Sequence, residues 1–174
     1  MKQVCLLSGA PGAGKTTIIK QAINRVKGKA GGFYTREIRI RGERQGFEII
    51  TLDGQSGTLA HVNINSPFQV NKYGVDTNTM DRVGVTAIRR AIQDCDTVVI
   101  DEIGKMELFS PNFRESVLEA FDSGKRILGT IMLSSHPWAD KIKKDTRVDV
   151  LQVSRTNRQQ ILNDIMAWLE DKTE

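Results

Sequence analysis

Several features that would narrow the class of protein are scarce in this sequence. Its 174 residues include only two cysteines, Cys5 and Cys95, too few for a disulfide framework, and we expect both to be reduced, packed thiols. The two histidines, His61 and His136, have no ligand-type residues near them in the sequence, so a zinc site is not expected. No apolar run approaches the roughly 20 residues that span a bilayer.

The remaining composition is that of a globular chain. A hydrophobic fraction of 39% and a charged fraction of 26% predict one domain spanning residues 1–174. Because Met1-Lys2-Gln3 leads directly into an apolar run, we expect no signal peptide. We also expect no membrane association and a cytoplasmic monomer. The net charge of +4 suits phosphate-bearing ligands. It permits nucleic-acid binding without requiring it, since the basic residues are scattered.

The most informative stretch is Gly9-Ala10-Pro11-Gly12-Ala13-Gly14-Lys15-Thr16. It matches G-x-x-x-x-G-K-[ST], the phosphate loop or Walker A motif, at every required position. The apolar residues 4–7 before it are typical of a buried parallel strand, and residues 17–26 after it have helical apolar spacing. An ordinary glycine turn is the alternative, but the strand–loop–helix context favours the phosphate loop.

This motif combines three chemical functions in one short loop. Its glycines let backbone N–H groups face one polyphosphate, and the helix that follows adds unpaired N–H groups. Lys15 supplies a positive charge to the outer phosphates and the Thr16 hydroxyl can ligate Mg²⁺. The sequence therefore predicts binding of a nucleoside triphosphate. The expected contacts are Gly9, Ala10, Pro11, Gly12, Ala13, Gly14, Lys15, Thr16 and Thr17.

A second informative stretch lies at residues 97–107. It begins with an apolar run that is followed by Asp101-Glu102. This is the usual Walker B partner of a phosphate loop. Asp101 is expected to hold Mg²⁺, directly or through water, and Glu102 to orient and deprotonate a water facing the terminal phosphate. Lys105 can either stabilise charge at the phosphate or form a surface ion pair with Glu102 or Glu107.

The other segments predict an antiparallel meander at the edge of a mostly parallel sheet. The expected meander has strands at 32–41, 46–52 and 58–62, with turns at 42–46 and 53–54. We expect a loop at 66–78, a helix over 80–94 capped by Thr79, and strands at 126–133 and 148–153. Two more helices are expected, one with Phe113, Val117, Leu118 and Phe121 on its apolar face, and one that begins at Asn157-Arg158 and presents Ile161, Leu162, Ile165, Trp168 and Leu169.

Two basic segments have both a functional and a structural interpretation. Among the hairpin arginines 36, 39, 41 and 44, Arg36 is the first candidate for a phosphate contact, but a solvated strand face is the favoured interpretation for each of them. Residues 134–147 form either a solvated helix or a flap over the nucleotide. If they form a flap that closes, Lys144 and Arg147 are candidate cationic contacts. Arg36, Arg44 and Arg147 remain the candidates for an arginine that contacts the transferring phosphate.

With these motifs in place, the chain resembles the small P-loop nucleoside triphosphatases of the THEP1 type. The resemblance rests on Gly9–Thr17, Gly32-Phe33-Tyr34-Thr35, the residues 72–76, the D-E-I-G-K-M-E-L run at 101–108, and Asn157-Arg158. It implies a three-layer Rossmann-like α/β fold and Mg²⁺-dependent hydrolysis of nucleoside triphosphates with broad base tolerance. It also implies phosphate and metal contacts for Lys15 and Thr16, with metal-organising and water-activating roles for Asp101 and Glu102. Asn71 stands where the family pattern has glycine.

Three functions fit the sequence. A nucleoside triphosphatase uses Glu102 to activate water. A small-molecule or nucleic-acid kinase uses the same loop, with Glu102 serving an acceptor hydroxyl. In a nucleotide-switched binding module, hydrolysis times a contact made by the hairpin at 32–53. Acceptor-dependent loss of triphosphate distinguishes the kinase, and strong stimulation by a partner distinguishes the module. The sequence favours the triphosphatase.

Overall fold

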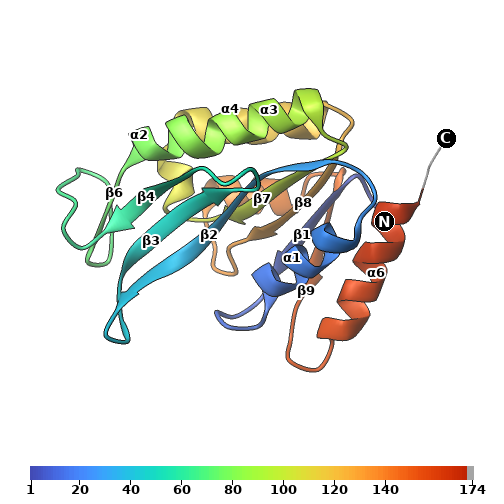
Figure 1. The fold of residues 1–174 in the computed structure, drawn as a ribbon, viewed down its shortest axis with the longest axis horizontal. Coiled ribbons are helices and arrows are strands. Elements are labelled where there is room, and N and C mark those ends of the chain that lie inside the picture. The colour runs from blue at the N-terminus through green and yellow to red at the C-terminus, as the bar shows by residue number, and fades with distance from the viewer. Residues whose placement is uncertain (172–174) are drawn as a thin grey trace.

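The structure is a computed structural model that describes residues 1–171, a sheet with helices on both faces (Figure 1). The strands are β1 (Val4–Ser8), β2 (Ala30–Ile40), β3 (Glu43–Thr51), β4 (Ser56–His61), β5 (Gln69–Val70), β6 (Tyr73–Val75), β7 (Thr97–Ile103), β8 (Arg126–Ile131) and β9 (Val148–Gln152). The helices are α1 (Lys15–Arg25), α2 (Thr77–Thr79), α3 (Thr86–Asp94), α4 (Pro111–Asp122), α5 (Pro137–Lys143) and α6 (Arg158–Glu170), with a π-helical segment at Met80–Val85 and a 3-10 helix at Glu107–Phe109. None of these helices is both long and apolar enough to cross a membrane.

Within the described residues, the strands form one sheet in the order β5-β6-β4-β3-β2-β7-β8-β1-β9. The neighbouring strands β2, β7, β8, β1 and β9, in that order, are parallel to one another. Strand β8 thus lies between β7 and β1. Parallel strands covered on both faces are apolar almost throughout, which explains the uninterrupted hydrophobic runs of β1 and β7. The predicted α/β fold with a mostly parallel central sheet is confirmed.

The two faces of the sheet build two apolar cores. Along β7, Val98 and Ile100 belong to the core on the side of α3 and α4, whereas Val99 belongs to the core under α1 and α6. The view in Figure 1 shows α3 and α4 along one face of the sheet and α1 and α6 along the other. Alternate side chains of a strand point to opposite faces, so a single buried strand supplies both layers.

The predicted meander is present, with a tighter first turn than expected. The turn predicted at 42–46 is wrong: β3 already begins at Glu43, and Arg41 and Gly42 alone connect the strands. These two residues have φ angles of 52° and 80°, the left-handed pair that matches the twist of a two-residue hairpin. Asn71, in the β5–β6 turn, also has a positive φ of 51°, which asparagine tolerates better than most residues.

The segment predicted as a loop at 66–78 contains more structure than expected. It holds β5 and β6, which pair with each other, and the start of the following helix. That helix is capped by Asp76 and not by Thr79, because the Asp76 carboxylate accepts a hydrogen bond from the Thr79 backbone N–H at 3.1 Å. On its other side β6 pairs with β4, a contact that the local sequence pattern does not encode.

The helix faces agree closely with the sequence pattern. The five apolar residues expected on α6 are all buried. Phe113, Val117 and Phe121 of α4 are buried as well, but Leu118 is 40% exposed, so its assignment to the apolar face was wrong. Residues 137–143 form the helix α5, with Ala139 and Ile142 buried against the domain.

Both cysteines are packed, free thiols, as predicted. Cys5 lies in β1, where burial raises the pKa of its thiol to about 12. Burial also raises the pKa of Cys95. Thiols held in the protonated form are poor nucleophiles, so neither cysteine is suited to covalent chemistry.

Candidate nucleotide site

The predicted phosphate loop connects β1 to α1. Gly12 and Gly14 have φ angles of 78° and 99°, values that glycine adopts without a steric penalty. Gly9 lacks room for a side chain, because a Cβ there would lie 2.6 Å from the carbonyl oxygen of Val153. Because α1 begins at Lys15, the N–H groups of its first turn have no helical partner. The backbone therefore suits an anion.

Lys15 is folded back over this loop. Its Nζ donates hydrogen bonds to the carbonyl oxygens of Gly9, at 2.6 Å, and Ala10, at 3.1 Å. Carbonyl oxygens are weaker partners for an ammonium group than phosphate oxygens. The side chain therefore stands where a phosphate can replace the two carbonyls.

Asp101 lies at the centre of the site, near the end of β7, and is only 2% exposed. The hydroxyl of Thr16 donates to its Oδ2 at 2.6 Å, and the hydroxyl of Thr130 donates to its Oδ1 at 2.7 Å. Burial raises the pKa of this carboxyl, and the two hydroxyl donors act in the opposite direction. The structure thus brings Thr16 and Asp101, 85 positions apart in the sequence, into direct contact.

Glu102, the neighbour of Asp101, is partly buried. Its pKa is raised by burial and by the negative charge of Asp101, whereas the positive charge of Lys15 lowers it. Such a pKa makes a carboxylate a stronger base than an exposed glutamate. The phosphate-loop lysine and the two carboxyls therefore belong to one electrostatic cluster.

Glu107 is a further acidic residue close to Glu102 whose burial sequence reasoning missed. It is only 6% exposed, and its pKa is raised well above the usual range by burial and by the charge of Glu102. Of the two alternatives for Lys105, the ion pair with Glu102 or Glu107 does not occur among the ion pairs of residues 1–171. Lys105 is exposed instead.

Thr130 and Arg158 are the other residues that sequence reasoning did not assign to the site. Apart from Arg126 at its start, β8 is apolar except for Thr130, and this polar residue inside a buried strand was the only sequence signal for it. Arg158 begins α6, and its guanidinium lies against the phosphate loop: a Cβ on Gly14 would lie 2.8 Å from Arg158 Cδ and 3.1 Å from its Nη1. A cation is therefore present beside the loop in addition to Lys15.

The structure separates two of the predicted cations from this site. The end of β9 at Gln152 lies beside the phosphate loop, because Gln152 pairs with Ser8. Arg147 precedes the opposite end of this strand. Its guanidinium binds Asp145 and Asp122 at the far edge of the sheet. Lys144, which follows the end of α5, lies at that same edge. The interpretation of these two residues as nucleotide-facing cations of a closing flap is wrong.

The two hairpin arginines that were candidates have acidic partners in the meander. Arg36 pairs with Glu48 at 2.9 Å across β2 and β3. Arg44 donates to Glu37 at 3.2 Å and to the phenol oxygen of Tyr73 at 2.9 Å. These contacts favour the interpretation of a charged strand face over that of a phosphate contact.

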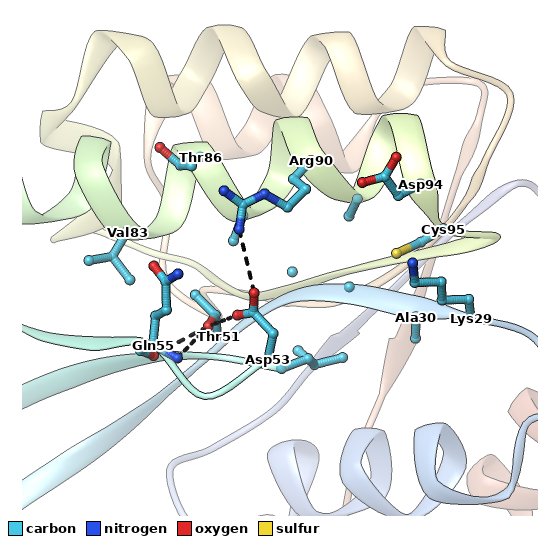
Figure 2. A pocket seen from close by; sticks show the side chains of 15 residues that line it. Lys29, Ala30, Thr51, Asp53, Gln55, Val83, Thr86, Arg90, Asp94 and Cys95 are labelled. Atoms are coloured by element: carbon cyan, nitrogen blue, oxygen red, sulfur yellow. Dashed lines mark hydrogen bonds and ion pairs between the residues drawn. The ribbon is translucent and has the colours of Figure 1, made fainter.

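A cavity of about 220 Å³ lies elsewhere, between α3 and the ends of β2 and β3 (Figure 2). Gly31 and Cys95 line it, and so do Arg90 and Asp53, which form an ion pair of 3.5 Å. Ala30, in this cavity, pairs with Thr97 at the start of β7, whereas Asp101 is near the other end of that strand. The cavity therefore lies at the opposite edge of the sheet from the phosphate loop.

These features define an α/β protein of the P-loop type, with a glycine loop after β1 and an acidic end to β7. The chain belongs to the NTPase family, whose family model matches residues 4–166.

Individual relatives agree with this assignment over nearly the whole chain. A protein named nucleoside-triphosphatase THEP1 from Thermotoga sp. (strain RQ2) is 47% identical over 165 residues, covering 95% of this chain and 94% of that protein. The crystal structure of THEP1 from Aquifex aeolicus superposes with a TM-score of 0.88 at 32% identity, covering 97% and 99% of the two chains. The solution structure of a human cancer-related nucleoside triphosphatase gives 0.81 at 35% identity, with both chains covered completely.

Proposed function

We propose that this protein hydrolyses nucleoside 5′-triphosphates to the diphosphate and phosphate with Mg²⁺, and that it tolerates different bases. The observation that carries the proposal is the Asp101 carboxylate, held by the hydroxyls of Thr16 and Thr130 beside the phosphate loop. The relatives are named nucleoside-triphosphatases, which supports the same activity.

The phosphate loop binds the triphosphate in this proposal. Backbone N–H groups of residues 9–17, except Pro11, which has none, surround the phosphates, and Lys15 exchanges its two carbonyl partners for β- and γ-phosphate oxygens. The guanidinium of Arg158, next to Gly14, adds positive charge at the side of the loop. All of these contacts are to groups that every nucleoside triphosphate carries, which supports tolerance for the base.

The residues at Asp101 fit Mg²⁺. The ion usually takes one or two carboxylates or hydroxyls from the protein and fills its other positions with water and substrate phosphates. Thr16 gives its hydroxyl hydrogen to Asp101, which leaves the oxygen lone pairs available as a ligand. Asp101 would hold the ion directly or through water. When bound, Mg²⁺ neutralises negative charge on the β- and γ-phosphates.

Glu102 activates the nucleophile in this mechanism. Its carboxylate accepts a proton from a water in line with the γ-phosphate. The water oxygen forms a bond to phosphorus as the bond from phosphorus to the β–γ bridging oxygen breaks, and the diphosphate leaves. Lys15 and the loop amides stabilise the charge that develops on the transferring group and on the bridging oxygen.

The test is phosphate release from ATP, GTP, CTP and UTP, with Mg²⁺ and no acceptor, by the parent protein and Glu102→Ala. We expect release from all four by the parent, and a decrease in kcat of about 100- to 10,000-fold in the variant with nucleotide binding retained. Glu115→Ala, at an exposed position of α4, is the control and should behave like the parent.

Two outcomes contradict the proposal at different points. Near-parental hydrolysis by Glu102→Ala removes the water-activating role of this residue. Tight nucleotide binding by the parent with negligible phosphate release means that water is not the acceptor, and a kinase reaction then becomes the better explanation.

A further inference from the structure

The turn after β7 brings the chain back beside Glu102. β7 ends at Ile103, and Glu107 begins a short 3-10 helix. Backbone hydrogen bonds fix this reversal, from Leu108 N to Gly104 O at 3.0 Å and from Met132 N to Ile103 O at 3.0 Å. These backbone hydrogen bonds help to fix the path of residues 103–108.

Gly104 leaves open the space that the Glu102 side chain occupies. A Cβ at this position would lie 2.5 Å from Glu102 Oε1 and 3.0 Å from Glu107 Oε2. Real side chains do not approach so closely, so any larger residue at 104 displaces the Glu102 carboxyl. The backbone of Gly104 does not itself require glycine, because its φ lies outside the left-handed region. Glycine is needed here for the space beside Glu102.

Glu107 borders the same space, since its Oε2 lies 3.0 Å from the Cβ position of Gly104. It is enclosed by its surroundings, with the neighbouring Leu108 at 2% exposure. Hydrogen bonding by the backbone at Gly104 and at Glu107 itself acts to lower its raised pKa. The group has no basic partner among the ion pairs of residues 1–171. A buried carboxyl with no cation beside it has no evident role in stabilising the fold, since burial of such a group is costly.

We propose that Gly104 and Glu107 are positioning residues that determine where the Glu102 carboxyl lies: Gly104 provides its space, and the buried side chain of Glu107 forms the wall behind it. The inference rests on the role proposed above for Glu102. It adds that the D-E-x-G-x-x-E spacing at residues 101–107 is a single device, in which residues 104 and 107 act only through residue 102.

The first test is Gly104→Ala. Its Cβ meets the end of a flexible side chain, so we expect Glu102 to move and the fold to remain. Displacement of a catalytic group by about 1 Å can reduce the rate about 100-fold, and we expect kcat to fall by about 10- to 100-fold with nucleotide binding and Tm retained. Gly28→Ala is the matched control, because a Cβ there also meets a carboxylate oxygen, Asp96 Oδ2 at 2.9 Å, far from the site. This control should keep the parental kcat.

The second test separates the effect of the size of the Glu107 side chain from the effect of its charge. Glu107→Gln keeps the size of the wall and an acceptor for hydrogen bonding by the backbone, and should retain kcat within about threefold. Glu107→Ala opens the space behind Glu102 and should lower kcat by about 10-fold or more, with nucleotide binding unchanged. Tm measurements on both variants show whether each is folded.

The third test is the double variant Glu102→Ala/Gly104→Ala. Because residue 104 acts through residue 102, the second substitution should cause no further loss of activity in the Glu102→Ala background. Near-parental kcat in Gly104→Ala, or an additive loss in the double variant, overturns the inference. Equal losses in Glu107→Gln and Glu107→Ala overturn the role of Glu107. A different result contradicts the role proposed for Glu102, namely near-parental hydrolysis by the single variant Glu102→Ala.

Discussion

The Thr130 hydroxyl donates a 2.7 Å hydrogen bond to Asp101 Oδ1 from β8, the strand between the phosphate-loop strand and the Asp101 strand. Both side chains are buried, and the other carboxylate oxygen receives the Thr16 hydroxyl. A buried carboxylate with a donor on each oxygen has little freedom to rotate. Thr130 therefore orients the residue that is proposed to organise Mg²⁺.

Thr130→Val should weaken this arrangement without changing the volume of the side chain. We expect the Mg²⁺ concentration for half-maximal phosphate release to rise about 10-fold, since one oxygen of Asp101 loses its donor at a cost of about 1–3 kcal/mol. A magnesium titration of activity is the measurement. Thr130→Ser, which retains a hydroxyl, is the control. An unchanged magnesium dependence in the valine variant would show that Thr130 does not position Asp101.

Lys15→Ala should abolish nucleotide binding. The ammonium already lies over the loop, on the carbonyls of Gly9 and Ala10, and its charge-assisted bonds to phosphate are worth about 3 kcal/mol or more, or about 100-fold in Kd. Titration with a fluorescent triphosphate analogue measures the effect. Lys27→Ala, at an exposed position after α1, should bind as the parent does. Parental affinity in Lys15→Ala would remove this lysine from the site.

Glu107→Gln should stabilise the protein at neutral pH and not at low pH. The pKa of Glu107 is raised above the ordinary value of 4.5 because the carboxyl is buried near Glu102. A group with a higher pKa in the folded state stabilises it fully below the unfolded pKa, and that stability is lost as the pH rises through the folded pKa. Glutamine has no such loss, so its advantage should grow with pH above about 4.5.

Thermal unfolding of Glu107→Gln and the parent between pH 4 and pH 9 is the measurement for this prediction. For a protein of this size, each kcal/mol corresponds to about 2–4 °C in Tm. Glu115→Gln, at an exposed position, is the matched control and should show no pH-dependent difference. A Tm difference for Glu107→Gln that stays constant across the pH range contradicts the raised pKa.

Arg158→Ala should weaken nucleotide binding less than Lys15→Ala does. The guanidinium lies against Gly14 at the edge of the loop, and an exposed charged contact of this kind is worth about 1 kcal/mol, or roughly five- to tenfold in Kd. The effect should diminish at high salt because exposed charges are screened. Arg25→Ala, in the last turn of α1, is the control. Equal affinities for parent and Arg158→Ala at low salt would exclude the contact.

The sequence alone determined the elements whose signals are local. The phosphate loop is recognisable because glycines, lysine and threonine must stand at fixed spacing for one backbone turn to surround a phosphate. The Asp-Glu end of β7 and the buried face of α6 follow from apolar patterns within a single element. Thr16 and Asp101, each predicted from a local motif to hold Mg²⁺, are in direct contact, since the ends of parallel strands lie at one edge of the sheet.

Only the tertiary structure decided which distant residues share the site and which do not. Strand order places β8, and with it Thr130, between β1 and β7, and it places Arg147 at the opposite edge although its charge made it a candidate. The positions of Arg158 beside Gly14 and of Glu107 behind Glu102 depend on how α6 and the turn after β7 pack. Local periodicity reports which face of an element is buried. The order and direction in which the elements pack are set by the whole hydrophobic core. That packing placed Thr130, Arg147, Arg158 and Glu107.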